Sequence, residues 1–321
     1  MKGEKHLFNY TKAELAEMAV RQNFIRDTLE KVIRLSEILD YMNSNLIMKK
    51  RLILKGGTAI NLTVFRLPRL SVDIDLDYSS EESREEMMVQ RKHISEELNV
   101  YMQTQGYALS PQSKSRHSLD SFVFSYMNLG GMRDNIKIEI NYSLRSHLFE
   151  PEDKPILADV IHTENMITVL QPIELFAAKI NALLSRAAAR DLYDTYNMVR
   201  LELFQKEDFE LLRKSIVFYT AISQEEIPEK YDVNTIDRIS IRKIRSDLLP
   251  VIQKGEFVDL EKIKSDVKEF LKELMVLTPE EKEFLKQFKG KRYRPELLFD
   301  DAQIVKRIEN HPMALWKMLE H

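Results

Sequence analysis

The chain has 321 residues, of which 44% are hydrophobic and 31% are charged, so it is long enough for two domains of ordinary size, each with a buried core. Its 8 glycines and 10 prolines argue against a low-complexity protein, and its lack of cysteine excludes disulfides, thiolate catalysis and zinc–thiolate sites. With a formal net charge of −3, binding to nucleic acid would require a local basic patch.

The first part of the chain predicts helices, then a short strand and a tight turn. Residues 11–14 fit a capping box that starts a helix, and a helical pattern of apolar residues follows over 24–45. Residues 51–54 are typical of a short buried strand. Gly56-Gly57 ends that strand, and residues 58–65 predict a helix whose first residue is the N-cap.

The middle of the chain alternates between strand and helix patterns. Acidic and apolar residues alternate over 73–78, which predicts a strand. Ser79 and Glu82 have the spacing of a second capping box, and the helix that they start is expected to run to about residue 105, before Gly106. Further strands are predicted over residues 107–110, 120–127, 135–142 and 156–161, with a turn at 128–131.

The character of the sequence changes near residues 163–172. After Pro172 helical periodicity dominates and glycine becomes rare. We therefore predict a mixed α/β fold with two domains: residues 1–168, which carry the strands and the N-terminal helices, and residues 169–321, which are helical. Residues 1–10 are polar and no run of about 18 apolar residues occurs, so we expect neither a signal peptide nor a membrane span, and a cytoplasmic protein.

Asp73, Asp75 and Asp77 are the most informative residues of the chain. Successive side chains of a strand point to opposite faces, so the three carboxylates share one face while Ile74 and Leu76 turn towards a core. Acidic residues are poor strand formers, and carboxylates this close raise one another's pKa unless a cation lies among them. The pattern indicates a divalent metal held by carboxylate oxygens; the alternative is a solvated edge strand.

The glycine turn before this strand favours phosphate binding. Gly57 permits a close approach of the backbone, amides at the start of the following helix can hold triphosphate oxygens, and the Thr58 hydroxyl can add a hydrogen bond. A metal beside a glycine turn that receives phosphate is typical of phosphoryl transfer. The simpler interpretation is a strand-to-helix turn with Thr58 as N-cap.

Together these features resemble a known family. A strand, a Gly-Gly-Thr turn, a helix and an Asp-x-Asp strand, with a third acidic residue, Glu139, on a later strand, resemble the DNA polymerase β-like nucleotidyltransferases. Several stretches are similar to the AbiEii/AbiGii toxin branch: residues 54–62 (LKGGTAINL), residues 69–76 (RLSVDIDL), Lys179 followed by residues 190–194 (RDLYD), and residues 293–299 and 311–317.

The resemblance implies a polymerase β-like mixed sheet with flanking helices, followed by a helical C-terminal domain. Together with the chemistry of the residues, it assigns Mg²⁺ or Mn²⁺ to three carboxylates: Asp73, Asp75 and Glu139. Catalysis is assigned to the same three residues with Lys179 and Asp194. The NTP is assigned to Gly56, Gly57, Thr58, Arg69 and Lys179.

The roles of Glu139, Arg69 and Asp77 need separate comment. Glu139 is either the third metal ligand, and a base for the incoming hydroxyl, or the partner of Lys137 or a neighbour in a cross-strand ion pair. Arg69 either contacts phosphate or pins the carboxylates as a structural partner. Asp77 is expected to lie outside the ligand set, behind the ligands or in solvent.

Lys179 lies on an otherwise apolar helix face. It either snorkels at the domain boundary or points into a cleft, and the resemblance favours the nucleotide phosphates. In one straight helix over 173–198, Lys179 and Asp194 would lie about 22 Å apart, too far for one site. We therefore predict a helix break near residues 185–189. Asp191 would then cap the next helix, with Asp194 as its third residue, and the resemblance pairs Asp194 with Lys179.

The predicted reaction is metal-dependent transfer of a nucleoside monophosphate from an NTP to a hydroxyl, with release of pyrophosphate. The resemblance implies a toxin of an abortive-infection or toxin–antitoxin system that acts on RNA, at a tRNA 3′ end. It also implies a separately encoded antitoxin that need not form a stable complex. Two alternatives stay open: transfer to a small molecule or protein, and a non-catalytic module that binds nucleotide or RNA.

Overall fold

The computed structural model describes residues 8–228 and 230–319, so the polar segment expected over 1–10 lies mostly outside the described residues. The chain forms two units, which are treated separately below. Unit 1 consists of residues 1–145, 151–169 and 251–254, and unit 2 consists of residues 146–150, 170–250 and 255–321. The short segments 146–150 and 251–254 thus each belong to a unit different from that of the residues that flank them.

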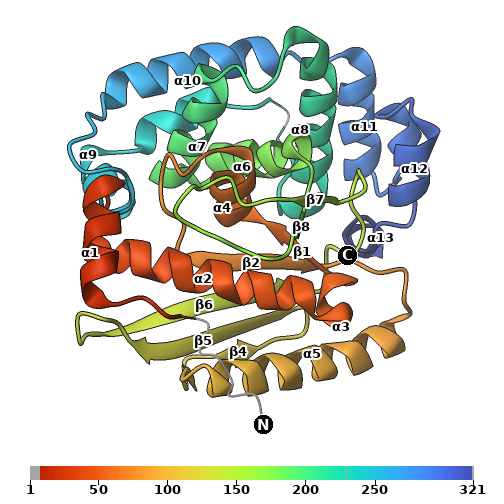
Figure 1. Ribbon diagram of the computed structural model, residues 1–321. Helices are drawn as coiled ribbons and strands as arrows, with labels where there is room; N and C mark the ends of the chain where they lie inside the picture. The colour runs from red at the N-terminus through yellow and green to blue at the C-terminus, as the bar shows by residue number, and fades with distance from the viewer. Residues whose placement is uncertain (1–7, 229, 320–321) are drawn as a thin grey trace. The chain divides into compact units, whose positions relative to one another are not determined.

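Within the described residues, unit 1 contains a mixed sheet of eight strands in the order β3-β5-β6-β2-β1-β8-β7, with β4 paired to β5 (Figure 1). The acidic strand β2 lies in the middle, parallel to β6 and antiparallel to β1. The strands are β1 Leu52–Lys55, β2 Asp73–Tyr78, β3 Ala108–Leu109, β4 Lys114–Ser115, β5 Leu119–Met127, β6 Arg133–Asn141, β7 Glu152–Lys154 and β8 Ile167–Val169.

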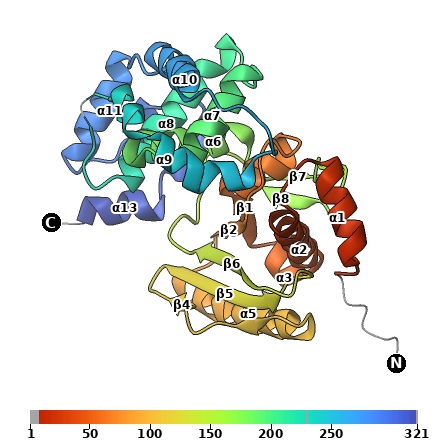
Figure 2. The same cartoon turned by 90° about the vertical axis from the view of Figure 1, so that its left-hand side faces the viewer.

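Helices flank this sheet. Helix α2 contacts β8, and α5 lies along the side of the sheet that β4 and β5 form (Figures 1 and 2). The predicted helix over 24–45 and the strand over 51–54 are confirmed in place and type. The helices of unit 1 are α1 Lys12–Arg21, α2 Arg26–Ser44, α3 Leu46–Lys49, α4 Gly56–Ala59, the π-helix η1 Ile60–Val64 and α5 Arg84–Thr104.

The core of unit 1 follows the predicted alternation. Ile74, Leu76 and Tyr78 of β2 are buried, while Asp73 and Asp75 on the other face are half-exposed. The isoleucines of β6 are buried in the same way. Period-two patterning therefore predicted which face of the central strands packs and which faces outward.

One predicted capping box and one predicted strand of unit 1 were wrong. The capping box of α5 is formed by Ser83 and Glu86, because the carboxylate of Glu82 is held by Arg51, 2.5 Å from its Nη2, and by Tyr78. Residues 156–161 are not a strand; the sheet instead gains β7, β8 and the short β4, which are too brief for their sequence patterns to mark.

Unit 2 is helical throughout its described residues, as predicted after residue 172. Helix α6 packs against α7 and α8, and α10 and α11 pack around this group (Figure 2). Its elements are α6 Pro172–Arg186, α7 Ala189–Arg200, η2 Lys206–Asp208, α8 Phe209–Ser223, η3 Val233–Arg238, α9 Ile241–Lys243, η4 Ile244–Leu248, η5 Leu249–Val251, α10 Leu260–Leu274, α11 Pro279–Lys289, η6 Pro295–Leu297, α12 Ala302–Ile308 and α13 Pro312–Leu319.

Across both units, no helix that the structure describes combines the length and the apolar character needed to cross a bilayer.

Candidate active site

The parallel pairing of β2 with β6 brings the predicted carboxylates to one face. In this register Asp75 lies opposite Glu139, and Asp73 lies opposite Lys137. Paired residues of neighbouring strands point to the same side of the sheet. Asp73, Asp75 and Glu139 therefore share one face, where all three side chains are half-exposed.

Lys137 lies among these carboxylates. Its Nζ is 2.9 Å from Oε1 of Glu139, two residues further along the same strand. Burial lowers the pKa of Lys137, but Glu139, Asp73 and Asp75 outweigh this effect and raise it. The ion pair of Glu139 with Lys137, the alternative to its role as metal ligand, is thus present, along one strand rather than across two, and it offsets part of the repulsion among the acids.

Carboxylates on one face are the donor type that Mg²⁺ and Mn²⁺ prefer, so the residues fit such an ion in chemistry. Among the residues that the structure describes, however, no three acidic or histidine side chains are grouped as a ready metal site. Asp73 and Asp75 form the adjacent pair, and the carboxylate of Glu139 is turned to Lys137. A three-carboxylate ligand set would require Glu139 to leave Lys137.

The turn between β1 and α4 packs its backbone directly against the acidic strand. Gly56 has φ +70°, and a Cβ added there would lie 2.8 Å from Oδ2 of Asp75. A Cβ on Gly57 would lie 2.6 Å from Nη2 of Arg69. Both glycines are therefore needed for close approach, and the first also for its left-handed backbone.

Thr58 does not cap the helix, contrary to the prediction. Helix α4 begins at Gly56, and the fully buried Thr58 hydroxyl donates to the carbonyl oxygen of Asp73. Gly56, with its positive φ, directly follows the last residue of β1. Thr58 therefore ties the turn to the first residue of β2.

Arg69 lies beneath the turn rather than in solvent. Its side chain is buried, and its Nη1 donates to the carbonyl oxygen of Leu70 at 3.0 Å. Its backbone pairs with Ile252, in the segment that returns to unit 1. Of the two interpretations of Arg69, this burial favours the structural one.

Asp77 is paired behind the half-exposed acids. It is buried and forms an ion pair with Nζ of Lys55. Burial raises the pKa of Asp77, and the Lys55 charge opposes that shift. Sequence reasoning did not identify Lys55 as the partner of Asp77. In the antiparallel pairing of β1 with β2, Lys55 lies opposite Asp75, two residues before Asp77 along β2.

In unit 2 the predicted break between the two helices is present. Helix α6 ends at Arg186, Ala187 adopts a left-handed conformation with φ 49°, and α7 begins at Ala189. The reversal brings Nζ of Lys179 to 3.2 Å from Oδ2 of Asp194, and both side chains are buried. Lys179 therefore neither snorkels into solvent nor lies remote from Asp194.

Asp191 is not the N-cap that was predicted. Ala188 takes that position, Asp191 is the third residue of α7, and Asp194 is the sixth. The carboxylate of Asp191 accepts from Nζ of Lys179 at 2.9 Å and from Nε of Arg186 at 2.8 Å. Two cations within reach draw the carboxylate away from the helix amides.

The chain is similar to known proteins. A family model described as nucleotidyl transferase AbiEii toxin, type IV toxin–antitoxin system, matches residues 37–292. The structure of MenT4, a nucleotidyltransferase toxin from Mycobacterium tuberculosis H37Rv, is similar with a TM-score of 0.63 and 17% identity. The match covers 96% of this chain and 99% of that one, and at this identity it shows the fold alone. No curated protein matches the chain.

Proposed function

The chain belongs to the nucleotidyl transferase AbiEii toxin family of type IV toxin–antitoxin systems, and from this premise we propose that it transfers a nucleoside monophosphate from an NTP to an RNA hydroxyl. It is a nucleotidyltransferase, and its family implies an antitoxin encoded as a separate protein. The nucleotide, the metal and the acceptor are the parts of the function that are proposed.

One observation carries the proposal. Asp75 and Glu139 lie in register on one face of the central strands, and the Gly56 backbone approaches Asp75 closely enough to exclude any side chain. Carboxylates next to a turn without side chains suit a complex of a divalent cation with a triphosphate. A solvated edge strand would need neither the central position nor the glycine contact.

Asp73 and Asp75 would hold Mg²⁺ or Mn²⁺, with Glu139 as the third ligand once its carboxylate leaves Lys137. A bound divalent cation supplies positive charge to the triphosphate and to the attacking oxygen. In the transfer, the acceptor oxygen bonds to the α-phosphorus, the bond from that phosphorus to the bridging oxygen breaks, and pyrophosphate leaves. We assign the hydroxyl proton to Glu139 as base.

The triphosphate is assigned to the backbone of Gly56 and Gly57. Thr58 and Arg69 support this assignment indirectly, because the first bonds to the Asp73 carbonyl and the second lies beneath Gly57. Their effect on NTP binding would come from holding the turn in position rather than from touching phosphate.

Lys179 is assigned to the nucleotide phosphates, with Asp194 as its positioning partner. This assignment rests on the family motif and on the ion pairs within unit 2. Asp191 and Asp194 both contact the Lys179 amine, at 2.9 Å and 3.2 Å.

RNA is the proposed acceptor, at a tRNA 3′ end, and the cytoplasm is the proposed compartment. The family's place in type IV toxin–antitoxin systems supports a macromolecular target whose modification stops growth. We also propose that the antitoxin need not form a stable complex with this chain.

Labelled nucleotides test the reaction directly. The purified chain is incubated with each α-phosphate-labelled NTP, Mg²⁺ and total cellular RNA, and the label is followed in RNA and protein fractions. We expect label in RNA, and a loss of at least about 100-fold for Asp73→Ala and Asp75→Ala, because each removes a proposed metal ligand.

The control is Glu81→Gln, which removes one charge from an exposed residue near the end of β2 and should keep full activity. Label in protein or in an added small molecule would replace RNA as the acceptor. Absence of label with every NTP and every acceptor would contradict the enzymatic proposal.

A further inference from the structure

Unit 1 contains a cavity of about 170 Å³ that shares no lining residue with the candidate active site. It lies between α2, the end of α5 and the residues that precede α1. At about 30 Å³ per water, this volume suits a small molecule rather than a chain segment. Its wall combines four aromatic rings with two charged side chains: Phe8, Tyr10, Tyr101, Tyr107, Arg34 and Glu37.

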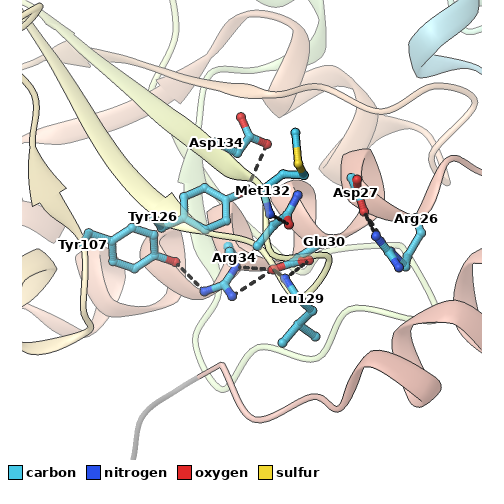
Figure 3. Close-up of polar contacts among 10 residues, drawn as sticks. Arg26, Asp27, Glu30, Arg34, Tyr107, Tyr126, Leu129, Met132 and Asp134 are labelled. Atoms are coloured by element: carbon cyan, nitrogen blue, oxygen red, sulfur yellow. Dashed lines mark hydrogen bonds and ion pairs between the residues drawn. The ribbon is translucent and has the colours of Figure 1, made fainter.

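The positive charge of the wall is already balanced. Nε of Arg34 donates to Oε1 of Glu30 at 2.9 Å, and Glu30 is fully buried (Figure 3). The amide of Leu129 donates to the two carboxylate oxygens of Glu30 at 3.1 and 3.0 Å. Glu30 is therefore saturated, and its negative charge neutralises Arg34.

The guanidinium group of Arg34 is also in contact with ring faces. Its central carbon lies 3.6 Å from the ring centre of Phe8 and 4.6 Å from that of Tyr126. Nη1 of Arg34 reaches the Tyr107 hydroxyl at 3.4 Å, as Figure 3 shows. These contacts commit Arg34 to the wall itself, so an anionic ligand would find little uncompensated positive charge there.

Glu37 differs from Arg34 because its charge is not balanced by a contact. Within the part of the chain that the structure describes, its carboxylate makes neither a hydrogen bond nor an ion pair. Burial raises the pKa of Glu37 to about 7; Arg34 opposes this shift and Asp40 adds to it. The attraction of Arg34 therefore does not compensate for the removal of Glu37 from water.

We propose that this cavity binds a small organic ammonium ion, with the ammonium group at Glu37 and the apolar body against the tyrosine rings. A cation restores the interaction that the carboxylate lost on burial, and ring faces attract cations through their quadrupoles. A neutral apolar ligand would leave Glu37 unsatisfied, and an anion would be repelled by it. Six of the nine lining residues are aromatic or aliphatic, and walls of this kind with a small number of polar groups are typical of small-molecule sites.

A pair of probes that differ in one atom tests the proposal. Binding of 2-phenylethylamine and of 2-phenylethanol to the full-length chain is measured by calorimetry at pH 8, where the amine is charged and Glu37 is ionised. We expect the amine to bind with a Kd at least about tenfold lower than that of the alcohol, because only the amine offers a cation to Glu37.

Glu37→Gln should remove the preference for the amine while keeping the cavity's shape. Glu17→Gln removes the same charge from the exposed face of α1 and should keep the preference. Circular dichroism checks that both variants fold. If a variant does not fold, the comparison of amine and alcohol binding to the wild type still tests the proposal. Equal binding of amine and alcohol, no binding of either, or a preference that survives Glu37→Gln would overturn the proposal.

Discussion

At the residue scale, the acidic face of β2 brings like charges close together. Asp73, Asp75 and Glu139 share that face, and the Lys137 amine is the cation that the described side chains bring to Glu139. Carboxylates gathered on one face repel one another, and a divalent cation among them relieves that repulsion. This crowding is the physical reason to expect binding of a divalent cation there.

Mg²⁺ should therefore raise the stability of the folded chain. We expect an increase of about 1 to 3 kcal/mol in the free energy of unfolding at saturating Mg²⁺, since an ion that binds the folded state alone stabilises it. The increase should nearly vanish in Asp75→Asn, which removes one proposed ligand. Thermal denaturation of both proteins across a Mg²⁺ titration measures this, and equal shifts in the two would contradict the ligand set.

Glu37 makes stability depend on pH. Its pKa is raised from 4.5 to about 7 in the folded chain, so its contribution to stability is complete below pH 4.5 and is lost as the pH rises through 7. At about 1.4 kcal/mol per unit of pKa, the loss amounts to about 3 kcal/mol.

Glu37→Gln removes this titration. The variant should match the wild type near pH 4.5 and should exceed it at pH 8 by up to about 3 kcal/mol in free energy of unfolding, measured in urea. Arg34 and Asp40 face the same carboxylate and are unchanged in the variant. A wild type and variant with parallel stability curves would show that Glu37 titrates normally.

At the scale of elements, the backbone conformation of the β1–α4 turn affects the position of Asp75, a carboxylate that we propose to be catalytic. Gly56 has a positive φ and lies against Asp75, whereas Gly131 has φ +79° with no atom within 4 Å of an added Cβ. These two glycines therefore separate the effect of backbone strain from the effect of steric contact.

Both Gly56→Ala and Gly131→Ala should lose about 1 kcal/mol of stability from the strained backbone. Gly56→Ala alone should also lose transferase activity, by about tenfold or more, because its methyl group displaces Asp75. Urea denaturation and the labelled-nucleotide assay measure the two effects. Full activity in Gly56→Ala would show that the carboxylate position is not held by this contact.

The helix break in unit 2 creates a buried cluster of charges. Lys179 contacts Asp191 and Asp194, so each residue of the cluster depends on the others. Removing one member of a buried ion pair typically costs about 3 to 5 kcal/mol, because the partner's charge remains in a low dielectric.

We expect Lys179→Met and Asp194→Asn each to destabilise the chain by about 3 kcal/mol. The double variant should be less destabilised than the sum, since it removes both charges together. A double-mutant cycle in urea measures the coupling. Additive effects would mean that the 3.2 Å contact contributes no coupling energy.

At the scale of the whole molecule, the match to MenT4 covers nearly all of both chains at 17% identity. The match therefore shows the fold over nearly the full length, whereas the enzyme class rests on the family model over residues 37–292 and the substrate has to be determined from the site. From the family's place in type IV toxin–antitoxin systems we expect the chain to arrest bacterial growth.

Induced expression of the full chain should arrest bacterial growth, and the same expression of Asp73→Ala should not, although the two proteins accumulate equally. Growth curves and immunoblots measure both quantities. Arrest by the Asp73→Ala protein would separate toxicity from transfer, and would place the toxic effect in another part of the molecule.

The sequence by itself determined the mixed α/β class, the family and the acidic face. Period-two alternation over 73–78 predicted the burial of Ile74 and Leu76, because each residue reverses the face of a strand, but not the burial of Asp77 on the acidic face. The break before Ala189 also followed from sequence, through the distance that a straight helix would impose on Lys179 and Asp194, which the family resemblance pairs in one site. Local spacing is enough for the alternation, whereas the helix break also needed the family resemblance.

Tertiary structure decided which charges meet. The β2–β6 register, the Lys55–Asp77 pair and the burial of Arg69 all join residues from separate elements. Asp191 pairs with Lys179 instead of capping its helix, for the same reason. Desolvation and long-range pairing depend on what surrounds a residue in space, and no periodicity in the chain encodes that surrounding.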